Sequence, residues 1–205
     1  PISLDLSDLS KLPQALSRID QDHPDVSGII ACAGQGRFGG LEGFSFEEIR
    51  AAVDVNFVSQ CFLVKAFLPR LKRSKRSDIV FIGSEAALVG GKHGAVYAAT
   101  KFAIRGFAQS LRKECAKSGV RITLINPGMV KTHFFDTLHF APGPDEDNYI
   151  EAADVAETIL SVLHMRPGTV IDEINLSPLK KVMLKKQKPK KREGRVGADN
   201  ALEID

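Results

Sequence analysis

The sequence predicts an α/β fold in which helices cover both faces of a parallel sheet, a doubly wound arrangement. Three short runs rich in Ile and Val, at 26–33, 78–84 and 120–128, have the length and composition of buried parallel strands. Helical patterns at 45–73 and 97–119 alternate with them. Because strands that alternate with helices form parallel sheets with a helical layer on each side, this order indicates the fold class.

The chain begins with two further elements. The alternation in "ISLDL" (2–6) is typical of a strand, and apolar spacing predicts a helix over 7–22, with Leu9, Leu12, Leu16 and Ile19 on one side.

The helix expected from Ser45 carries a capping box, since Glu48 follows three residues later. Its first turns have one apolar stripe, formed by Phe46, Ile49, Val53 and Phe57. Beyond Phe57 apolar residues surround the helix, which is typical of a buried helix. We therefore expect the sheet on one side of it and a second subunit on the other.

The second half of the chain continues the pattern. Segment 97–119 places Ile104, Phe107, Ala108, Leu111 and Cys115 on one helix face, and Gly119 is a plausible helix stop. Residues 133–150 read as irregular, followed by a helix at 153–164 and a strand at 168–174. The region 180–195 holds nine Lys or Arg and one Glu, while the whole chain has a net charge of +3, so the remainder is acidic. We predict a folded body at 1–179 and a basic, disordered tail at 180–205.

Composition excludes several classes of protein. A chain of 205 residues is large enough for one domain with a sizeable core. Its three cysteines are widely spaced without a C-x-x-C pair, which argues against a disulfide framework or a zinc site. Neither a signal peptide nor an apolar run of about 18 residues is visible. We expect a cytoplasmic protein with no metal.

A glycine-rich stretch imitates a phosphate-binding loop. Gly34, Gly36 and Gly39 have the spacing of the dinucleotide fingerprint, with Asp54 near the distance expected for its acid. The fingerprint requires glycines that open a helix, but the helix here begins near Ser45 and contains Asp54. We interpret the stretch as a loop that follows a strand, with Ala33 and Gly34 near a ligand.

Polar residues gather where the predicted strands end. The carboxyl ends of parallel strands share one edge, where ligands bind, and Ser84 lies there. Tyr97 and Lys101, four residues apart, share a helix face. A lysine cation would lower the pKa of the Tyr97 phenol toward the range useful for proton transfer, and Ser84 would hold a substrate oxygen. No residue in the set carries hydride, so a cofactor must supply it.

These residues, in this order, resemble the classical short-chain dehydrogenases/reductases over 1 to about 179. "YAATK" matches their Y-x-x-x-K motif, "IVFIGSEAA" their serine, "VDVNFVSQ" their helix asparagine and "NPGMVKT" their Pro-Gly turn. The resemblance implies Tyr97 as acid/base, Lys101 as its partner and ligand of the nicotinamide ribose, Ser84 as substrate-orienting residue, and Asn56 as holder of a relay water.

The resemblance also implies a Rossmann-like three-layer α/β/α fold, an NAD(P)(H)-dependent oxidoreductase acting on a carbonyl or alcohol, and NADP favoured over NAD. A homodimer or homotetramer would form through the helices at 45–73 and 97–118. Besides Tyr97 and Lys101, the implied cofactor contacts are Asp5 and Leu6 at the adenine, Cys32, Ala33 and Gly34 at the adenosine, and Pro127, Gly128, Val130 and Thr132 at the nicotinamide.

Two departures from the family pattern leave alternatives open. Ala31 and Cys32 stand where the family has asparagines, so hydrogen bonds made by those side chains are lost. The family's glycine-rich phosphate loop would lie upstream of Pro1, so we expect an N-terminally incomplete fold, by truncation. The alternative function is a non-catalytic binding or scaffold protein. A serine hydrolase is a third class, but Ser84 is not in a G-x-S-x-G motif.

Four smaller expectations complete the prediction. His93 is a candidate pocket residue. Phe134, Phe135, Leu138 and Phe140 form either a lid over substrate or simple loop packing. Cys32 is expected as a small buried hydrophobe rather than a reactive thiol. We expect the basic tail to act as a solubilising segment without contact to nucleic acid or membrane.

Overall fold

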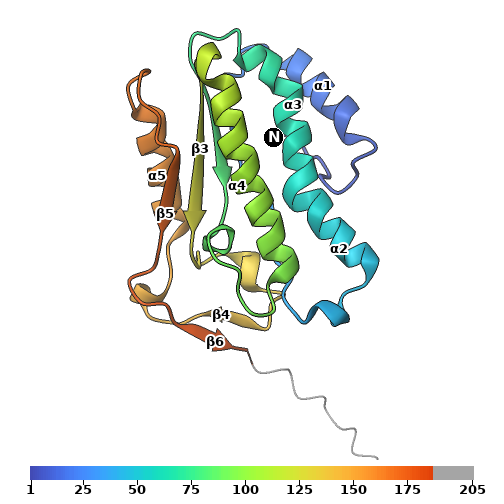
Figure 1. Ribbon diagram of the computed structural model, residues 1–205, viewed down its shortest axis with the longest axis vertical. Helices are drawn as coiled ribbons and strands as arrows, with labels where there is room; N and C mark the ends of the chain where they lie inside the picture. Colours follow the sequence, from blue (N-terminus) through green and yellow to red (C-terminus); the bar gives the residue numbers. More distant parts are fainter. Residues whose placement is uncertain (187–205) are drawn as a thin grey trace, which may run out of the picture.

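The computed structural model describes residues 1–186 and contains a four-stranded parallel sheet (Figure 1). Its strands, in spatial order, are β1 (Gly28–Ala31), β2 (Ser77–Ile82), β3 (Val120–Pro127) and β5 (Glu173–Leu176). Each neighbouring pair is parallel. The predicted parallel α/β sheet is confirmed.

Helices cover both faces of this sheet, as the alternation of side chains in each strand requires. In β2, Ile79 and Phe81 belong to the main core with α1 (Leu12–Asp22), α3 (Ser59–Leu71) and α4 (Ala95–Cys115). Val80, one position away, packs with Val162 of α5 (Ala152–His164) on the opposite face. In Figure 1, α4 and α3 lie in front of the sheet and α5 lies behind it.

A long helix runs from α2 (Phe46–Val53) through a π-helical turn at Asp54–Val58 into α3. The predicted capping box is confirmed: the Ser45 hydroxyl accepts from the Glu48 N–H at 3.1 Å, and the Glu48 carboxylate accepts from the Ser45 N–H at 3.0 Å. Among the described helices this one has the length and apolar composition of a membrane span, which core helices share. Its inner face joins the core, whereas Phe46 is 88% exposed, so the expected stripe is only partly covered.

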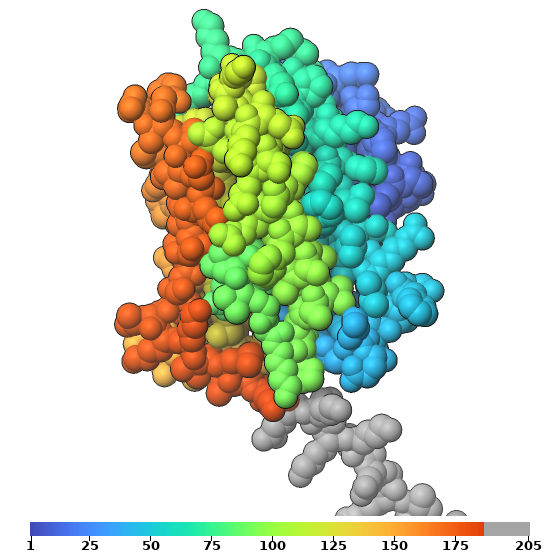
Figure 2. Space-filling model, viewed as in Figure 1, coloured from blue at the N-terminus to red at the C-terminus, as the bar shows by residue number. Residues whose placement is uncertain are grey.

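The helix α4 carries the predicted Tyr97 and Lys101 and ends as expected. After Cys115 the chain makes a 3-10 turn, and Gly119 adopts a left-handed conformation with φ of 77°. A glycine tolerates this conformation without a steric penalty, which explains the stop. Figure 2 shows that the outer side of α4 lies at the molecular surface between α3 and β5.

Three elements differ from the sequence prediction. The helix expected over 7–22 begins only at Leu12, because the preceding residues form turns. Residues 2–6 form no strand, because no described strand pairs with them. The last strand of the sheet begins at Glu173 rather than at 168, because the preceding residues cross from α5 to the sheet edge.

The predicted start of the tail is part of the folded body. In β6, Met183–Lys185 pairs antiparallel with β4 (Phe140–Pro142), which interrupts the segment expected to be irregular. The Lys186 N–H extends this pairing to the His139 carbonyl at 2.8 Å. The rest of the predicted tail, 187–205, lies outside the described residues.

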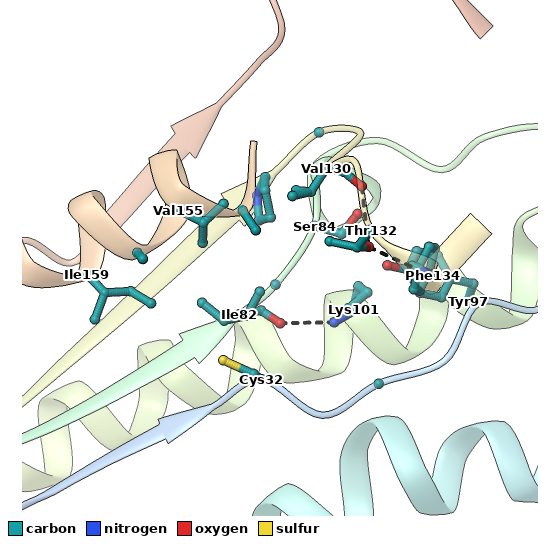
Figure 3. A pocket seen from close by; sticks show the side chains of 16 residues that line it. Cys32, Ile82, Ser84, Tyr97, Lys101, Val130, Thr132, Phe134, Val155 and Ile159 are labelled. Atoms are coloured by element: carbon teal, nitrogen blue, oxygen red, sulfur yellow. Dashed lines mark hydrogen bonds between the residues drawn. The ribbon is translucent and has the colours of Figure 1, made fainter. Parts of the chain in front are cut away.

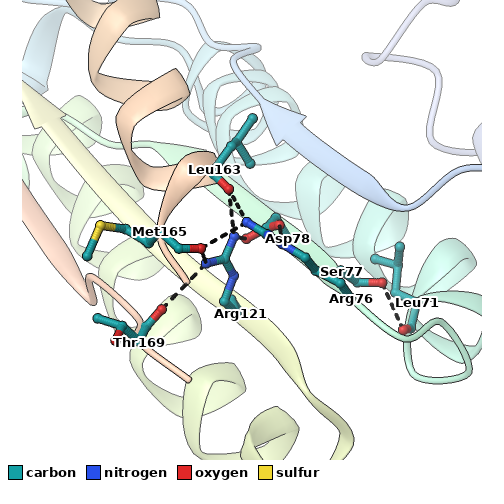
Figure 4. Close-up of polar contacts among 8 residues, drawn as sticks. All are labelled: Leu71, Arg76, Ser77, Asp78, Arg121, Leu163, Met165 and Thr169. Atoms are coloured by element: carbon teal, nitrogen blue, oxygen red, sulfur yellow. Dashed lines mark hydrogen bonds and ion pairs between the residues drawn. The ribbon is translucent and has the colours of Figure 1, made fainter. Parts of the chain in front are cut away.

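A buried arginine, Arg121, links α5 to the sheet through polar contacts (Figure 4). Arg121 of β3 pairs with Asp78 of β2 at 2.6 Å, and its guanidinium donates to the carbonyl oxygens of Leu163 and Met165 at 3.2 and 2.9 Å. These carbonyls are at the C-terminal end of α5, where a cation offsets the helix dipole. The arginine therefore stabilises the contact between α5 and the sheet.

Candidate active site

A cavity of about 440 Å³ opens at the carboxyl edge of the sheet, where β2 and β3 end (Figure 3). Most of the residues predicted for the site line it: Cys32, Gly34, Ser84, Tyr97, Lys101, Pro127, Gly128, Val130 and Thr132. They come from loops after three strands and from the start of α4, so the topology brings together residues that are distant in sequence.

Tyr97 and Lys101 point toward the cavity from adjacent turns of α4. Both side chains are buried: Tyr97 is 7% exposed and Lys101 is 4% exposed. The Lys101 ammonium lies 5.8 Å from the centre of the Tyr97 ring and donates to the Ile82 carbonyl at 2.9 Å. The expected shared helix face is therefore present.

Burial sets the protonation of this pair. Loss of solvation lowers the pKa of Lys101 to about 8, since the charged form is penalised. Burial raises the pKa of Tyr97, with the Ser84 hydroxyl acting in the opposite direction and the Glu85 charge adding to the rise. The expectation that Lys101 lowers the pKa of Tyr97 is not met in this geometry, because the ammonium is directed at the Ile82 carbonyl.

Ser84 begins a short 3-10 turn directly after β2. Its hydroxyl accepts from the Ala86 N–H at 3.1 Å, and the side chain faces the cavity beside Tyr97. Only 9% of the residue is exposed. The turn therefore fixes the serine at the edge where the sequence places it.

Asn56 lies behind the cavity rather than in its wall. The π-helical turn orients its fully buried amide toward the loop after β1, where it accepts from the Gln35 N–H at 2.8 Å and donates to the Gln35 carbonyl at 3.0 Å. A third contact, of 3.2 Å, joins it to the hydroxyl of Thr100 on α4. Asn56 therefore holds the loop against the helix that bears Tyr97.

Three of the predicted cofactor residues are not in this cavity. Asp5 is exposed and accepts from the N–H and hydroxyl of Ser7 at 2.8 and 2.7 Å, which lowers the pKa of its carboxyl. Leu6 and Ala33 line a separate cavity of about 230 Å³, which Cys32 also touches. Their assignment to a cofactor remains a prediction.

Gln60 of α3 supports the loop in a way that sequence reasoning missed. Its amide donates to the Ala33 carbonyl at 2.8 Å, and the residue is 1% exposed. The available signal was a glutamine within the mostly apolar first half of α3, on the side that faces the loop. It holds the loop at the place where Ala31 and Cys32 lack the amide side chains of the family pattern.

An aromatic wall, formed by Phe38 and Phe134, packs against Tyr97 at one side of the cavity, and Phe38 itself lines the neighbouring hollow. Phe38 and Phe134 lie with ring centres 5.0 and 5.9 Å from that of Tyr97. Phe134 lines the cavity, whereas Phe135, Leu138 and Phe140 form a small core of their own. Phe38 was missed because its neighbours in sequence are glycines and charged residues with no periodic pattern.

Other candidate residues lie elsewhere. Cys32 is exposed as a residue, so the expectation of a small buried hydrophobe is wrong. Its thiol is partly desolvated, which raises its pKa. His93 has a positive φ of 62° and does not line the cavity. Within residues 1–186 no cluster of side chains suits a metal ion.

Known proteins resemble this chain in sequence. The family model described as short chain dehydrogenase matches residues 1–140. An uncharacterized oxidoreductase of Staphylococcus epidermidis is 28% identical over 178 residues, which cover 87% of this chain and 76% of the relative. Retinol dehydrogenase 8 of Bos taurus is 36% identical over 151 residues, 70% of this chain but 47% of the relative, so the chain spans about half of that protein.

Solved structures agree in fold. An alcohol dehydrogenase from Thermococcus sibiricus, complexed with 5-hydroxy-NADP, superposes with a TM-score of 0.76 at 26% identity over 91% of this chain and 75% of that one. ElxO with NADP bound gives a TM-score of 0.75 at 20% identity over 86% and 76%, a likeness of fold alone.

Proposed function

Because this chain belongs to the short chain dehydrogenase family, we propose that it transfers hydride between a nicotinamide dinucleotide and the carbonyl or alcohol carbon of a small molecule. The observation that carries the proposal is the convergence of Ser84, Tyr97 and Lys101 on one cavity. Oxidoreductase relatives support the class of reaction.

The cavity residues fit the nicotinamide end of such a cofactor. Ile82 and Val130 supply apolar surface suited to a planar ring. The Lys101 ammonium has three N–H donors, of which Ile82 takes one, so two remain for ribose hydroxyls. When bound, the cofactor supplies or accepts the hydride that no side chain provides.

Tyr97 holds the proton that the reaction needs. Burial raises the pKa of its phenol, so the hydroxyl is neutral near pH 7 and ready to donate to a carbonyl oxygen as that oxygen gains negative charge. The Ser84 hydroxyl holds the same oxygen in place. In the reverse direction the Tyr97 phenolate accepts the alcohol proton, and the Ser84 hydroxyl is the neighbouring group that lowers the pKa of this phenol.

The aromatic wall of Phe38 and Phe134 limits water beside Tyr97 and favours an apolar substrate. Both rings pack against the Tyr97 ring. A relative named retinol dehydrogenase 8 supports the inclusion of long apolar alcohols among test substrates. We propose NADP as the preferred cofactor, supported by related folds that hold NADP.

The proposal is tested by following the near-ultraviolet absorbance of reduced cofactor while the protein acts on a panel of apolar and polar carbonyls. Turnover with at least one carbonyl supports it. Calorimetry with NADP and NAD identifies the cofactor. Absence of both binding and turnover would favour the alternative of a non-catalytic binding protein.

We further propose a homodimer or homotetramer formed through α2, α3 and α4. Phe102 on the outer side of α4 is 43% exposed, and Phe46 and Val53 are exposed on the long helix. A monomer by light scattering would contradict this assembly.

A further inference from the structure

Asn126, at the end of β3, is a fully buried amide with a fixed orientation. Its Nδ2 donates to Glu173 Oε1 at 2.7 Å and to Asn175 Oδ1 at 3.0 Å, both on β5. Since an amide nitrogen has two donors, both are used. The Oδ1 atom must therefore face the other way, toward the end of β2.

The backbone at the end of β2 lies close to the Asn126 Oδ1 atom. The Ser84 N–H donates to Asn126 Oδ1 at 3.4 Å. At Gly83 an added Cβ would lie 2.1 Å from the same oxygen, so only a glycine permits this approach. The backbone at Gly83 and Ser84, which places Ser84 at the cavity, therefore packs directly against the Asn126 side chain.

The acid that holds Asn126 is itself held by the helix that bears Tyr97. Arg105 of α4 pairs with Glu173, with Nε 2.9 Å from Oε1 and 3.2 Å from Oε2. Arg105 follows Lys101 by one helical turn. A continuous set of polar contacts therefore runs from α4 through Glu173 and Asn126 to Ser84.

We propose that Asn126 and Glu173 are positioning residues that set Ser84 relative to Tyr97 and Lys101. Neither side chain lines the cavity, so both act through the backbone at Gly83 and Ser84. The proposal rests on the function given above, and misplacement of a reacting group by about 1 Å costs about 100-fold in rate.

The variant Asn126→Asp tests this arrangement. A carboxylate cannot donate to Glu173, so two like charges meet and the serine is displaced. When protonated, the introduced carboxyl can again donate to Glu173 and accept from the Ser84 N–H. The groups facing it are Glu173 and Asn175 of β5 and Arg105 of α4, while the Lys101 cation is bound to the Ile82 carbonyl.

We expect kcat of Asn126→Asp to be about 10- to 100-fold below that of the parent protein near pH 8, with the deficit shrinking as the pH falls toward about 5. KM should change less than kcat. The double variant Asn126→Asp/Glu173→Gln should regain most of kcat and lose the added pH dependence, because the Gln amide donates to the new carboxylate. A deficit that is constant with pH and unaffected by Glu173→Gln would overturn the proposal.

Thr123→Val is the matched control. Thr123, on the same strand, donates to the Ile171 carbonyl at 2.7 Å and is 2% exposed, but it does not contact Ser84. It should lower stability without changing the pH profile of kcat. An altered profile in this control would show that loss of any buried β3 contact suffices, which contradicts a positioning role.

Hydrogen exchange at the Ser84 amide separates this inference from the proposed reaction. In Asn126→Leu the Ser84 N–H should exchange about tenfold faster than in Thr123→Val, after each exchange rate is corrected for the global stability of its variant. This difference is expected whether or not turnover is found. Equal protection in the two variants would refute the inference, while absence of turnover in the parent protein would refute the reaction alone.

Discussion

The Lys101 ammonium donates to the Ile82 main-chain carbonyl at 2.9 Å, which anchors α4 to the end of β2 in the lining of the cavity (Figure 3). The contact joins the helix that bears Tyr97 to the strand that leads to Ser84. Within residues 1–186 no carboxylate pairs with this buried cation, and this affects the stability of the fold.

Deprotonation of Lys101 should make the folded protein more stable as the pH rises. The folded-state pKa of Lys101 is lowered from 10.5 to about 8, so above pH 8 the folded chain loses the proton while the unfolded chain retains it. Relative to Lys101→Met, the free energy of unfolding should therefore increase by about 2 kcal/mol between pH 8 and pH 10. Urea unfolding across this range measures it. Lys113→Met, at an exposed position of the same helix, should show no such difference from the parent protein.

Loss of the Tyr97 hydroxyl should abolish most activity without unfolding the protein. Tyr97→Phe retains the contacts with Phe38 and Phe134 but removes the proton donor, so turnover should fall by about 100- to 10,000-fold. The chain has 2 tyrosines, and Tyr149→Phe is the matched control because its hydroxyl meets Lys131 at 3.0 Å outside the cavity. Near-normal turnover in Tyr97→Phe would exclude the proposed acid.

The buried Arg121 should contribute far more to stability than an exposed arginine. Arg121→Met leaves Asp78 without its close partner and removes donors from the end of α5, which should cost about 3–5 kcal/mol. Arg112→Met breaks the ion pair with Asp172, whose side chain is 70% exposed, and should cost less than about 1 kcal/mol. Chemical denaturation compares the two, and equal losses would contradict the role assigned to Arg121.

The same substitution at two glycines should have opposite effects. Gly119→Ala forces a side chain into the left-handed region at φ of 77° and should destabilise by about 1 kcal/mol. Gly106→Ala, inside α4 with open space around it, should stabilise by about 0.5–1 kcal/mol because alanine favours the helix. Thermal unfolding of both variants gives the signs, and a stabilising Gly119→Ala would contradict the described helix end.

Local patterns predicted most of the fold. The apolar runs that became β2 and β3, the Ser45 capping box and the Gly119 stop depend on neighbours in sequence, so they could be recognised there. The strand expected at 2–6 and the tail expected from 180 depended on partners. Residues 2–6 have no described strand beside them, whereas 183–185 pair with 140–142.

By itself the sequence determined the fold class, the family and the residue types that meet at the cavity, because motif order and strand alternation are properties of the chain. Only the tertiary structure decided how those residues act on one another. The direction of the Lys101 ammonium, the placement of Asn56 behind the loop and the orientation of the Asn126 amide depend on buried partners distant in sequence. In a buried site each donor must find an acceptor, and that choice is made by packing in three dimensions.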